Sequence, residues 1–155
     1  ATMRVVLLLA LTLASASAAV NVRGSVYAAM EARSGQQSNC TQFVSLFSSD
    51  AKYQSPVGSP AAVGRDAIHA ACEEWNNNLG PQGNGWYPHD LWNAPTETAF
   101  VLRVRAVSHG GCTVDLQGIV TLVFNDSTGL IDEWKHYYDA DWDGPQLKAS
   151  CLGRA

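Results

Sequence analysis

The chain has 155 residues, of which 46% are hydrophobic and 15% are charged, and its formal net charge is −4. This length suits one domain with a sizeable core and leaves no room for a second of similar size. No basic stretch runs along the sequence, which argues against nucleic acid as a partner. We therefore expect a single, mildly acidic globular domain.

The N-terminal segment predicts an export signal that is not part of the fold. Arg4 precedes a short apolar run over residues 5–13, which is too brief to cross a bilayer, and small residues at 14–18 offer cleavage sites. A buried N-terminal helix is the alternative. We expect residues 1–18 to be removed and the mature protein to be secreted, or to stay in another oxidising compartment of the secretory pathway, without a membrane segment.

Helical spacing predicts three helices in the first half of the chain. The first carries one stripe in which only the last residue is polar: Val22, Val26, Ala29, Met30 and Arg33. A short second helix follows over residues 43–47. After an extended run at 51–55 and a corner with prolines at 56 and 60, which cannot be helical, a third helix begins behind Gly64. Its apolar face holds Ile68, Ala71, Cys72, Trp75 and Leu79.

The second half of the chain predicts strands. A short one over residues 86–92 contains Pro88, which is typical of an edge or bent strand. Two long alternating runs, at 96–108 and 112–124, are joined by a tight hairpin over 109–111. A turn at 125–129 leads into a last strand over 130–139.

The cysteines are even in number, which in an oxidising compartment predicts two disulfides with three possible connectivities: Cys40, Cys72, Cys112 and Cys151. No CxxC or clustered His and Cys spacing supports zinc, and we expect neither a metal nor another cofactor. Sequons at Asn39 and Asn125 predict glycosylation in a eukaryotic secretory pathway. The sequence leaves open whether three aspartates bind calcium, because Ser150 stands where a calcium loop needs glutamate: Asp139, Asp141 and Asp143.

Two segments resemble the NTF2-like, or SnoaL-like, superfamily, which includes ketosteroid isomerase. Residues 47–68, FSSDAKYQSPVGSPAAVGRDAI, are similar to the opening of these domains, and residues 129–139, GLIDEWKHYYD, to their last strand. The resemblance extends over residues 20–142. It implies an α+β fold in which three helices pack on a strongly curved antiparallel sheet, forming a cone with an internal pocket.

The resemblance also implies the bounds of the domain and the pairing of the cysteines. It places one domain over residues 19–145 and a tail over 146–155 that is pinned by a disulfide. Cys40 would begin the second helix and Cys72 would lie in the third, which pack together. This favours a Cys40–Cys72 bridge, with Cys112–Cys151 as the other.

The same resemblance implies that alternate residues of the last strands face the pocket. His136 is then the best acid/base candidate, because its reference pKa of about 6.5 lets it exchange a proton near neutrality. A structural histidine bonded to a backbone carbonyl is the alternative. Tyr27 matches the family tyrosine and is the second catalytic candidate. The expected ligand-binding residues are Phe47, Tyr53, Ser55, Trp75, Val120, Trp134 and Tyr138.

One further polar pair is visible in the strand pattern. Arg103 and Arg105 share one strand face. If that face lines the pocket, the pair would bind an anion such as a carboxylate. The alternative is an exposed sheet face or an oligomer contact.

The departures from the family pattern limit the function. Ketosteroid isomerase chemistry needs a carboxylate base and an acidic oxyanion donor, and this chain has Ser55 and Val120 at the matching positions. We do not expect that mechanism, and the sequence leaves open whether the protein is an enzyme.

Two hypotheses follow. In the first, the protein binds a small apolar molecule in its conical pocket, with isomerase, cyclase or hydrolase-type acid/base chemistry. In the second, it is a non-catalytic, disulfide-stapled module that forms a homodimer or binds a partner protein through the sheet face. An inward His136 beside an open cavity favours the first, whereas a cavity filled by Trp75, Trp134 and Phe124 favours the second.

Overall fold

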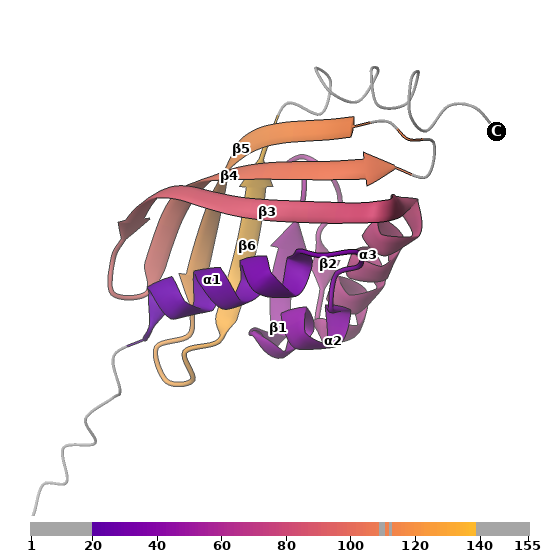
Figure 1. Cartoon of the computed structure of the whole chain (residues 1–155). Coiled ribbons are helices and arrows are strands. Elements are labelled where there is room, and N and C mark those ends of the chain that lie inside the picture. The colour runs from indigo at the N-terminus through magenta and orange to yellow at the C-terminus, as the bar shows by residue number, and fades with distance from the viewer. Residues whose placement is uncertain (1–19, 109–110, 112, 139–155) are drawn as a thin grey trace, which may run out of the picture.

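Three helices pack against a curved six-stranded sheet (Figure 1). The computed structural model describes residues 20–108, 111 and 113–138. The helices are α1 (Val22–Arg33), α2 (Cys40–Ser45) and α3 (Arg65–Asn78). The strands are β1 (Phe47–Gln54), β2 (Ala62–Val63), β3 (Leu79–Asn93), β4 (Glu97–Ser108), β5 (Thr113–Phe124) and β6 (Ile131–Tyr137). The α+β architecture predicted from the sequence is confirmed.

The strand order in the sheet is β2-β1-β6-β5-β4-β3. Neighbouring strands are antiparallel except for β1 and β6, which pair in parallel, so the expectation of a wholly antiparallel sheet is wrong at this pair. The physical reason is connectivity, because the chain leaves β1 for α3 and the β3–β5 meander before β6 returns beside β1. The sheet stays open, with β2 and β3 as its edges.

Local signals explain where the helices begin. The side chain of Asn21 accepts a hydrogen bond from the Gly24 N–H at 3.0 Å and caps α1, and Asn39 caps α2 through the Gln42 N–H at 3.0 Å. Helix α3 starts behind Gly64, whose φ of 81° suits glycine, and carries Asp66 in its first turn.

The edge strand β3 is longer than predicted. The sequence pattern places Leu79 on a helix face and begins the strand only at residue 86, whereas in the structure residues 79–85 already continue the strand beside β4. Asn84 also exchanges two backbone hydrogen bonds with Gly35, at 2.7 and 2.8 Å, so the loop after α1 covers part of this edge. Gly83 makes the approach possible, because a Cβ there would lie 2.1 Å from the Gly35 carbonyl oxygen. Pro88 is tolerated because β3 is an edge strand, as expected.

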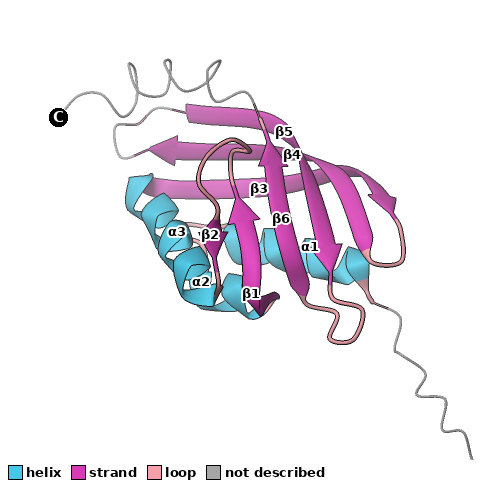
Figure 2. Cartoon of the chain, turned by 180° about the vertical axis from the view of Figure 1, so that it is seen from behind, coloured by secondary structure: helices cyan, strands magenta, loops and turns pink. Residues whose placement is uncertain are grey.

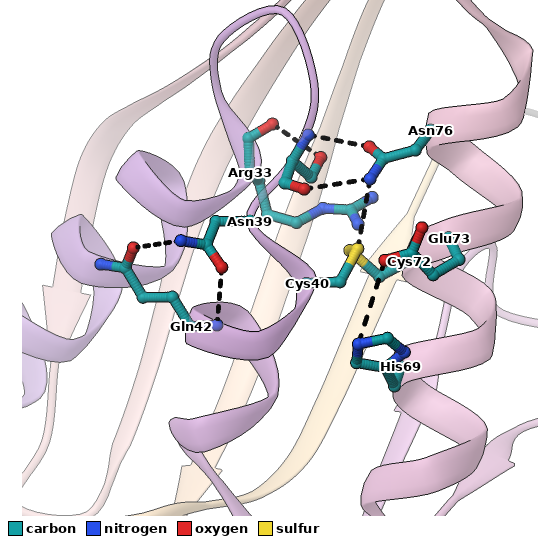
Figure 3. The surroundings of a disulfide bond; sticks show 9 residues. Arg33, Asn39, Cys40, Gln42, His69, Cys72, Glu73 and Asn76 are labelled. Carbon is teal, nitrogen blue, oxygen red and sulfur yellow. Dashed lines mark hydrogen bonds and ion pairs between the residues drawn. A yellow bond between two sulfur atoms is a disulfide. The ribbon is translucent and has the colours of Figure 1, made fainter.

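A disulfide joins Cys40 at the start of α2 to Cys72 in α3, which confirms this pairing (Figure 3). Beside it, the Asn76 amide bonds both the N–H and the carbonyl of Ser38, at 2.8 and 3.0 Å. These links fix α2 and the end of α1 against α3. The proposed Cys112–Cys151 bridge lies outside the described residues.

Seen from behind, helix α1 lies on the far side of the sheet (Figure 2). The buried hydrophobic side chains lie between the helices and the inner sheet face. At the centre of this core aromatic rings pack edge to face or tilted, with Phe43 5.0 Å from Phe47 and 5.7 Å from Trp134 between ring centroids. Phe47 belongs to β1, although the sequence pattern places it at the end of a helix. Within the described ranges, no helix has the length and hydropathy needed to cross a membrane. The expected signal segment, residues 1–18, and the expected tail, residues 146–155, lie outside these ranges.

Candidate functional site

A cavity of about 260 Å³ opens beside the aromatic core, between the helices and the inner face of the sheet. Its helical walls come from the end of α1 and from α3: Arg33, Ala71, Glu74, Trp75 and Asn78. The sheet side contributes two aliphatic side chains, Val104 and Leu116, and five polar or aromatic ones: Tyr53, Ser55, Trp86, His136 and Tyr138. We call this space the pocket.

His136 is the central polar group of the sheet wall. Strand β6 presents it inward, where the residue is only 2% exposed, and its backbone carbonyl accepts a hydrogen bond from the Val57 N–H at 2.8 Å. The Nδ1 atom lies 3.2 Å from the Ser55 hydroxyl, whereas the buried Nε2 atom has no hydrogen-bond partner in the described structure. His136 is therefore hydrogen-bonded at one nitrogen and, among the described residues, has no partner at the other.

The protonation state of His136 follows from its surroundings. Burial, together with the positive charge of Arg33, lowers the pKa of His136 from 6.5 to about 4. The imidazole is then neutral at pH 7. If Ser55 donates to Nδ1, Nε2 is an N–H donor, and if Nδ1–H donates to Ser55, Nε2 is an acceptor. In either tautomer Nε2 has one hydrogen-bonding capacity that the described residues leave unused.

Arg33 is the most unusual residue of the pocket. It is the last residue of α1 and is only 2% exposed, and Figure 3 shows its side chain extending toward α3. The Nε and Nη1 atoms are buried and lack a hydrogen-bond partner among the residues described. Burial lowers the pKa of Arg33, and nearby Tyr53 opposes this effect in part. A guanidinium with two unsatisfied nitrogens is costly to bury.

Aromatic rings surround the Arg33 guanidinium. Its central carbon lies 4.5 Å from the centroid of Trp86, 5.0 Å from Phe43 and 5.9 Å from the ring of Trp75. These distances permit cation–π attraction, which compensates part of the lost hydration. The end of α1 is held in place by the Trp86 N–H, which donates to the Ser34 hydroxyl at 3.0 Å.

The remaining rings give the pocket flat aromatic walls. Trp75 and Trp86 meet edge to face at 6.0 Å, and Tyr138 lies 4.6 Å from the His136 ring between centroids. The indole Nε1 atoms of Trp75 and Trp86 are also buried without a partner among the described groups. The pocket thus combines flat apolar surfaces with several unused N–H groups.

The structure brings together five of the predicted site residues and separates the others. Tyr53, Ser55, Trp75, His136 and Tyr138 line the pocket. The other three predicted ligand-binding residues point inward, as the strand pattern requires, but are buried in the core instead of lining the pocket: Phe47, Val120 and Trp134. Strand parity predicts the face of the sheet, but it does not say at which end of that face the cavity lies.

Tyr27 lies outside the pocket, contrary to the sequence prediction. It was expected as a catalytic group, but it is 46% exposed on α1 and does not line the pocket. Its ring lies 5.8 Å from the guanidinium carbon of Arg23. The reason is helical geometry, because Tyr27 directly follows the buried Val26 and so lies about 100° around the helix from the buried stripe.

Ser55 and Val120, which stand at the positions matching the acidic groups of ketosteroid isomerase, bring no carboxylate to the pocket. Ser55 bonds His136, and Val120 pairs with His136 in the sheet ladder and is fully buried. Of the described lining residues, only Glu74 has a carboxylate, and it is exposed. Among the residues that the structure describes, no three His, Cys, Asp or Glu side chains form a group that could hold a metal. Asp139, Asp141 and Asp143 lie outside the described residues.

Arg103 and Arg105 lie on the outer face of the sheet, away from the pocket. Both contact Asp115 on β5, with closest nitrogen–oxygen distances of 2.6 and 3.4 Å. The pair therefore belongs to the exposed face that was the alternative in the sequence interpretation. Arg103 and Arg105 therefore do not form an anion-binding site in the pocket.

Arg33 and Trp86 were not predicted as site residues. Trp86 had no sequence signal beyond the chain's high tryptophan content. Arg33 had one, because it occupies the buried stripe of α1 together with Val22, Val26, Ala29 and Met30. An arginine in an apolar stripe indicates either a paired buried charge or a binding group.

Comparison with known proteins gives matches in solved structures only, since no family model and no curated protein sequence matches the chain. A Mycobacterium tuberculosis protein in complex with estradiol-17β-hemisuccinate has a TM-score of 0.67 and 19% identity, covering 77% of this chain and 94% of its own. The Δ5-3-ketosteroid isomerase from Mycobacterium sp. has a TM-score of 0.65 and 20% identity, with the same coverage of 77% and 94%. An NTF2-like protein of unknown function from Burkholderia pseudomallei has a TM-score of 0.67 and 13% identity, covering 81% and 95%.

At these identities the likeness concerns the fold. The matched structures include proteins described as ketosteroid isomerase-like, NTF2-like and SnoaL-like. The residue patterns at 47–68 and 129–139 predict the same group. The chain therefore has the fold shared by ketosteroid isomerase-like, NTF2-like and SnoaL-like proteins.

Proposed function

We propose that the protein binds a small, largely apolar molecule in the pocket, with His136 as a polar contact. The observation that carries the proposal is a cavity of about 260 Å³ whose wall includes a buried imidazole, and the Nε2 atom of this imidazole has no hydrogen-bond partner among the described residues. A purely structural histidine would be expected to satisfy both nitrogens within the protein. The open nitrogen favours a ligand as its missing partner.

The distribution of the large rings supports this proposal over a filled cone. Trp134 and Phe124 are buried in the core and do not line the cavity, so they leave it open. Trp75 forms a wall of the pocket and does not fill it. Similar folds also bind such ligands, since one matched structure contains estradiol-17β-hemisuccinate.

The chemistry available at the site is that of a neutral imidazole. With a pKa of about 4, His136 carries little positive charge at neutral pH and is a poor general acid there. It can still orient a ligand or accept a proton from an acidic one. We therefore place binding first, and acid/base chemistry of the isomerase, cyclase or hydrolase type is a further step of the same proposal.

The test combines native mass spectrometry with a variant that fills the pocket. Purified protein is examined for co-purifying small molecules, and Ala71→Phe places a ring in the cavity from α3. We expect a bound molecule in the wild type that is lost in Ala71→Phe. The matched control is Ala70→Phe, on the exposed side of the same helix, which should keep the ligand. Equal ligand content in the wild type and Ala71→Phe would contradict the proposal.

Self-association through the sheet remains a second candidate, which one observation favours. Ile119 and Tyr137 are paired across β5 and β6, and they are 49% and 44% exposed. Exposed apolar pairs on a sheet face are typical of contact surfaces. Sedimentation analysis tests this, because Ile119→Lys should shift a dimer to monomer, whereas Gln117→Lys, on the same strand and exposed, should not. A monomeric wild type would remove this candidate.

We also propose export and glycosylation. The Cys40–Cys72 disulfide is compatible with an oxidising compartment. Asn39 is exposed at the start of α2, and Asn125 lies in the turn before β6. Expression in a eukaryotic secretory host should give a protein that begins near Ala19 and loses mass on treatment with an N-glycosidase. An intracellular product with residues 1–18 intact would contradict the export proposal.

A further inference from the structure

We propose that Arg33 makes the pocket a site for a small monocarboxylate, whose carboxylate pairs with the buried guanidinium while its apolar body lies between the aromatic walls. This inference rests on the proposed function and specifies the ligand class. It starts from the burial of Arg33, which is 2% exposed with Nε and Nη1 unpartnered among the described residues.

A buried arginine is normally paired. Arginine is almost never fully buried without a partner, since moving its charge out of water costs several kcal/mol unless an anion and hydrogen bonds replace the lost hydration. Nε and Nη1 together carry three N–H bonds. None of the ion pairs found among the described residues includes Arg33, and the aromatic rings around it attract its charge without accepting its N–H bonds as an anion would.

The charges along the wall indicate a single negative charge on the ligand. Arg33 is the only cationic side chain among the described lining residues, because His136 is neutral at pH 7, and Glu74 adds a negative charge at the exposed part of the wall. A dianion such as a phosphate monoester would leave one charge unpaired in a low-dielectric space. A carboxylate matches the charge and the planar donor geometry of one guanidinium.

The size and shape of the pocket restrict the rest of the ligand. Its volume of about 260 Å³ lies just below the usual range for small-molecule pockets, roughly 300–1,000 Å³. Trp75, Trp86 and Tyr138 offer ring surfaces for a flat body. His136 Nε2 and the indole N–H groups provide further hydrogen bonds. The ligand class is therefore a monocyclic aromatic or similarly compact carboxylic acid.

The experiment compares benzoate with its neutral isostere benzamide and with phenyl phosphate, using tryptophan fluorescence and calorimetry at pH 7. We expect benzoate to bind the wild type about 10–100-fold more tightly than benzamide, which corresponds to a charge-assisted hydrogen bond of about 1.5–3 kcal/mol. Phenyl phosphate should bind more weakly than benzoate. Arg33→Met should abolish the preference for benzoate over benzamide.

Two controls separate the role of Arg33 from charge and folding effects. Arg103→Met removes the same charge from the outer sheet face and should leave benzoate binding unchanged. If Arg33→Met does not fold, the wild-type protein still provides a test. In that case the Nε–H resonance of Arg33, assigned in the wild-type protein by triple-resonance NMR, should shift on addition of benzoate and stay in place with benzamide.

The outcomes distinguish the two proposals. Equal binding of benzoate and benzamide, blocked by Ala71→Phe, would overturn the carboxylate inference and support a neutral ligand. Tighter binding of phenyl phosphate than of benzoate would also overturn it. If millimolar benzoate, phenylacetate and benzamide all fail to bind and no molecule co-purifies, both proposals fail.

Discussion

Acidification should weaken the fold through His136. The perturbation is a change of pH from 7 to 4, across the interval between the pKa of an ordinary histidine, 6.5, and that of buried His136, about 4. Because the folded pKa is the lower one, the unfolded chain binds more protons in this interval. Stability is therefore fully present above pH 6.5 and is lost as the pH falls toward 4.

The magnitude follows from the two pKa values. At about 1.4 kcal/mol per pKa unit, the difference between 6.5 and about 4 corresponds to about 3 kcal/mol of folding free energy. The titratable and charged groups that share the pocket with His136 come from every packed element: Arg33, Tyr53, Glu74 and Tyr138. Arg33 has the same sign as the imidazolium and therefore strengthens the effect.

The assay is urea unfolding of the wild type and of His136→Gln at pH 7, 6, 5 and 4. The variant cannot titrate at this position, so the difference in unfolding free energy between the two proteins should change by about 3 kcal/mol over this range. Carboxylates elsewhere affect both proteins alike and cancel. Parallel stability curves, or an NMR titration giving His136 a pKa near 6.5, would refute the reasoning.

Three further predictions concern the supports of the site. Gly118→Ala should lower the unfolding free energy by about 1–3 kcal/mol and alter the His136 ring resonances, because a Cβ there would lie 2.4 Å from the Tyr137 carbonyl oxygen and 3.0 Å from His136 Nε2; an unchanged urea midpoint would contradict this. Cys40→Ser combined with Cys72→Ser should cost about 3–4 kcal/mol, since the bridge closes a sequence separation of 32 residues; a loss below 1 kcal/mol in the same assay would disprove it. Arg33→Met should raise the unfolding free energy by about 1 kcal/mol, because it removes a buried charge that has no partner among the described residues; a clear loss would indicate a structural partner for the guanidinium.

The sequence predicts most of the fold because the deciding signals are local. The stripe of α1, the corner at Pro56 and Pro60, and the alternation along β4 and β5 each act over a few residues. The parallel β1–β6 pair is different, because it joins segments about eighty residues apart and no residue of either strand specifies the direction of its partner. The long β3 was missed for a related reason, since its first part is held by contacts with β4 and Gly35 in place of a strand-like composition.

The predictions for the site agree or disagree with the structure for the same reason. Strand parity places His136 and Tyr138 inward, and the chain direction brings Ser55 beside them. Tyr27 was assigned by matching a family position, and the helical phase of α1, which the same residues reveal, places it outside the pocket. The helical phase is the stronger argument here, because rotation about a helix decides the direction of a side chain directly.

Arg33 shows how a buried stripe can contain both structure and function. Its position in the apolar face of α1 is visible in the sequence, but only the structure shows that Nε and Nη1 have no hydrogen-bond partner among the described residues. A protein selected for stability alone would be expected to place an apolar side chain there, since an unpaired guanidinium weakens the fold. A residue that lowers stability at the wall of a cavity is more simply explained by what it binds, and stability given up at binding sites is a common feature of proteins. The same comparison applies to His136, Trp75 and Trp86, which also line the pocket and have buried nitrogens without a partner among the described residues, so the proposed ligand would account for all four side chains together.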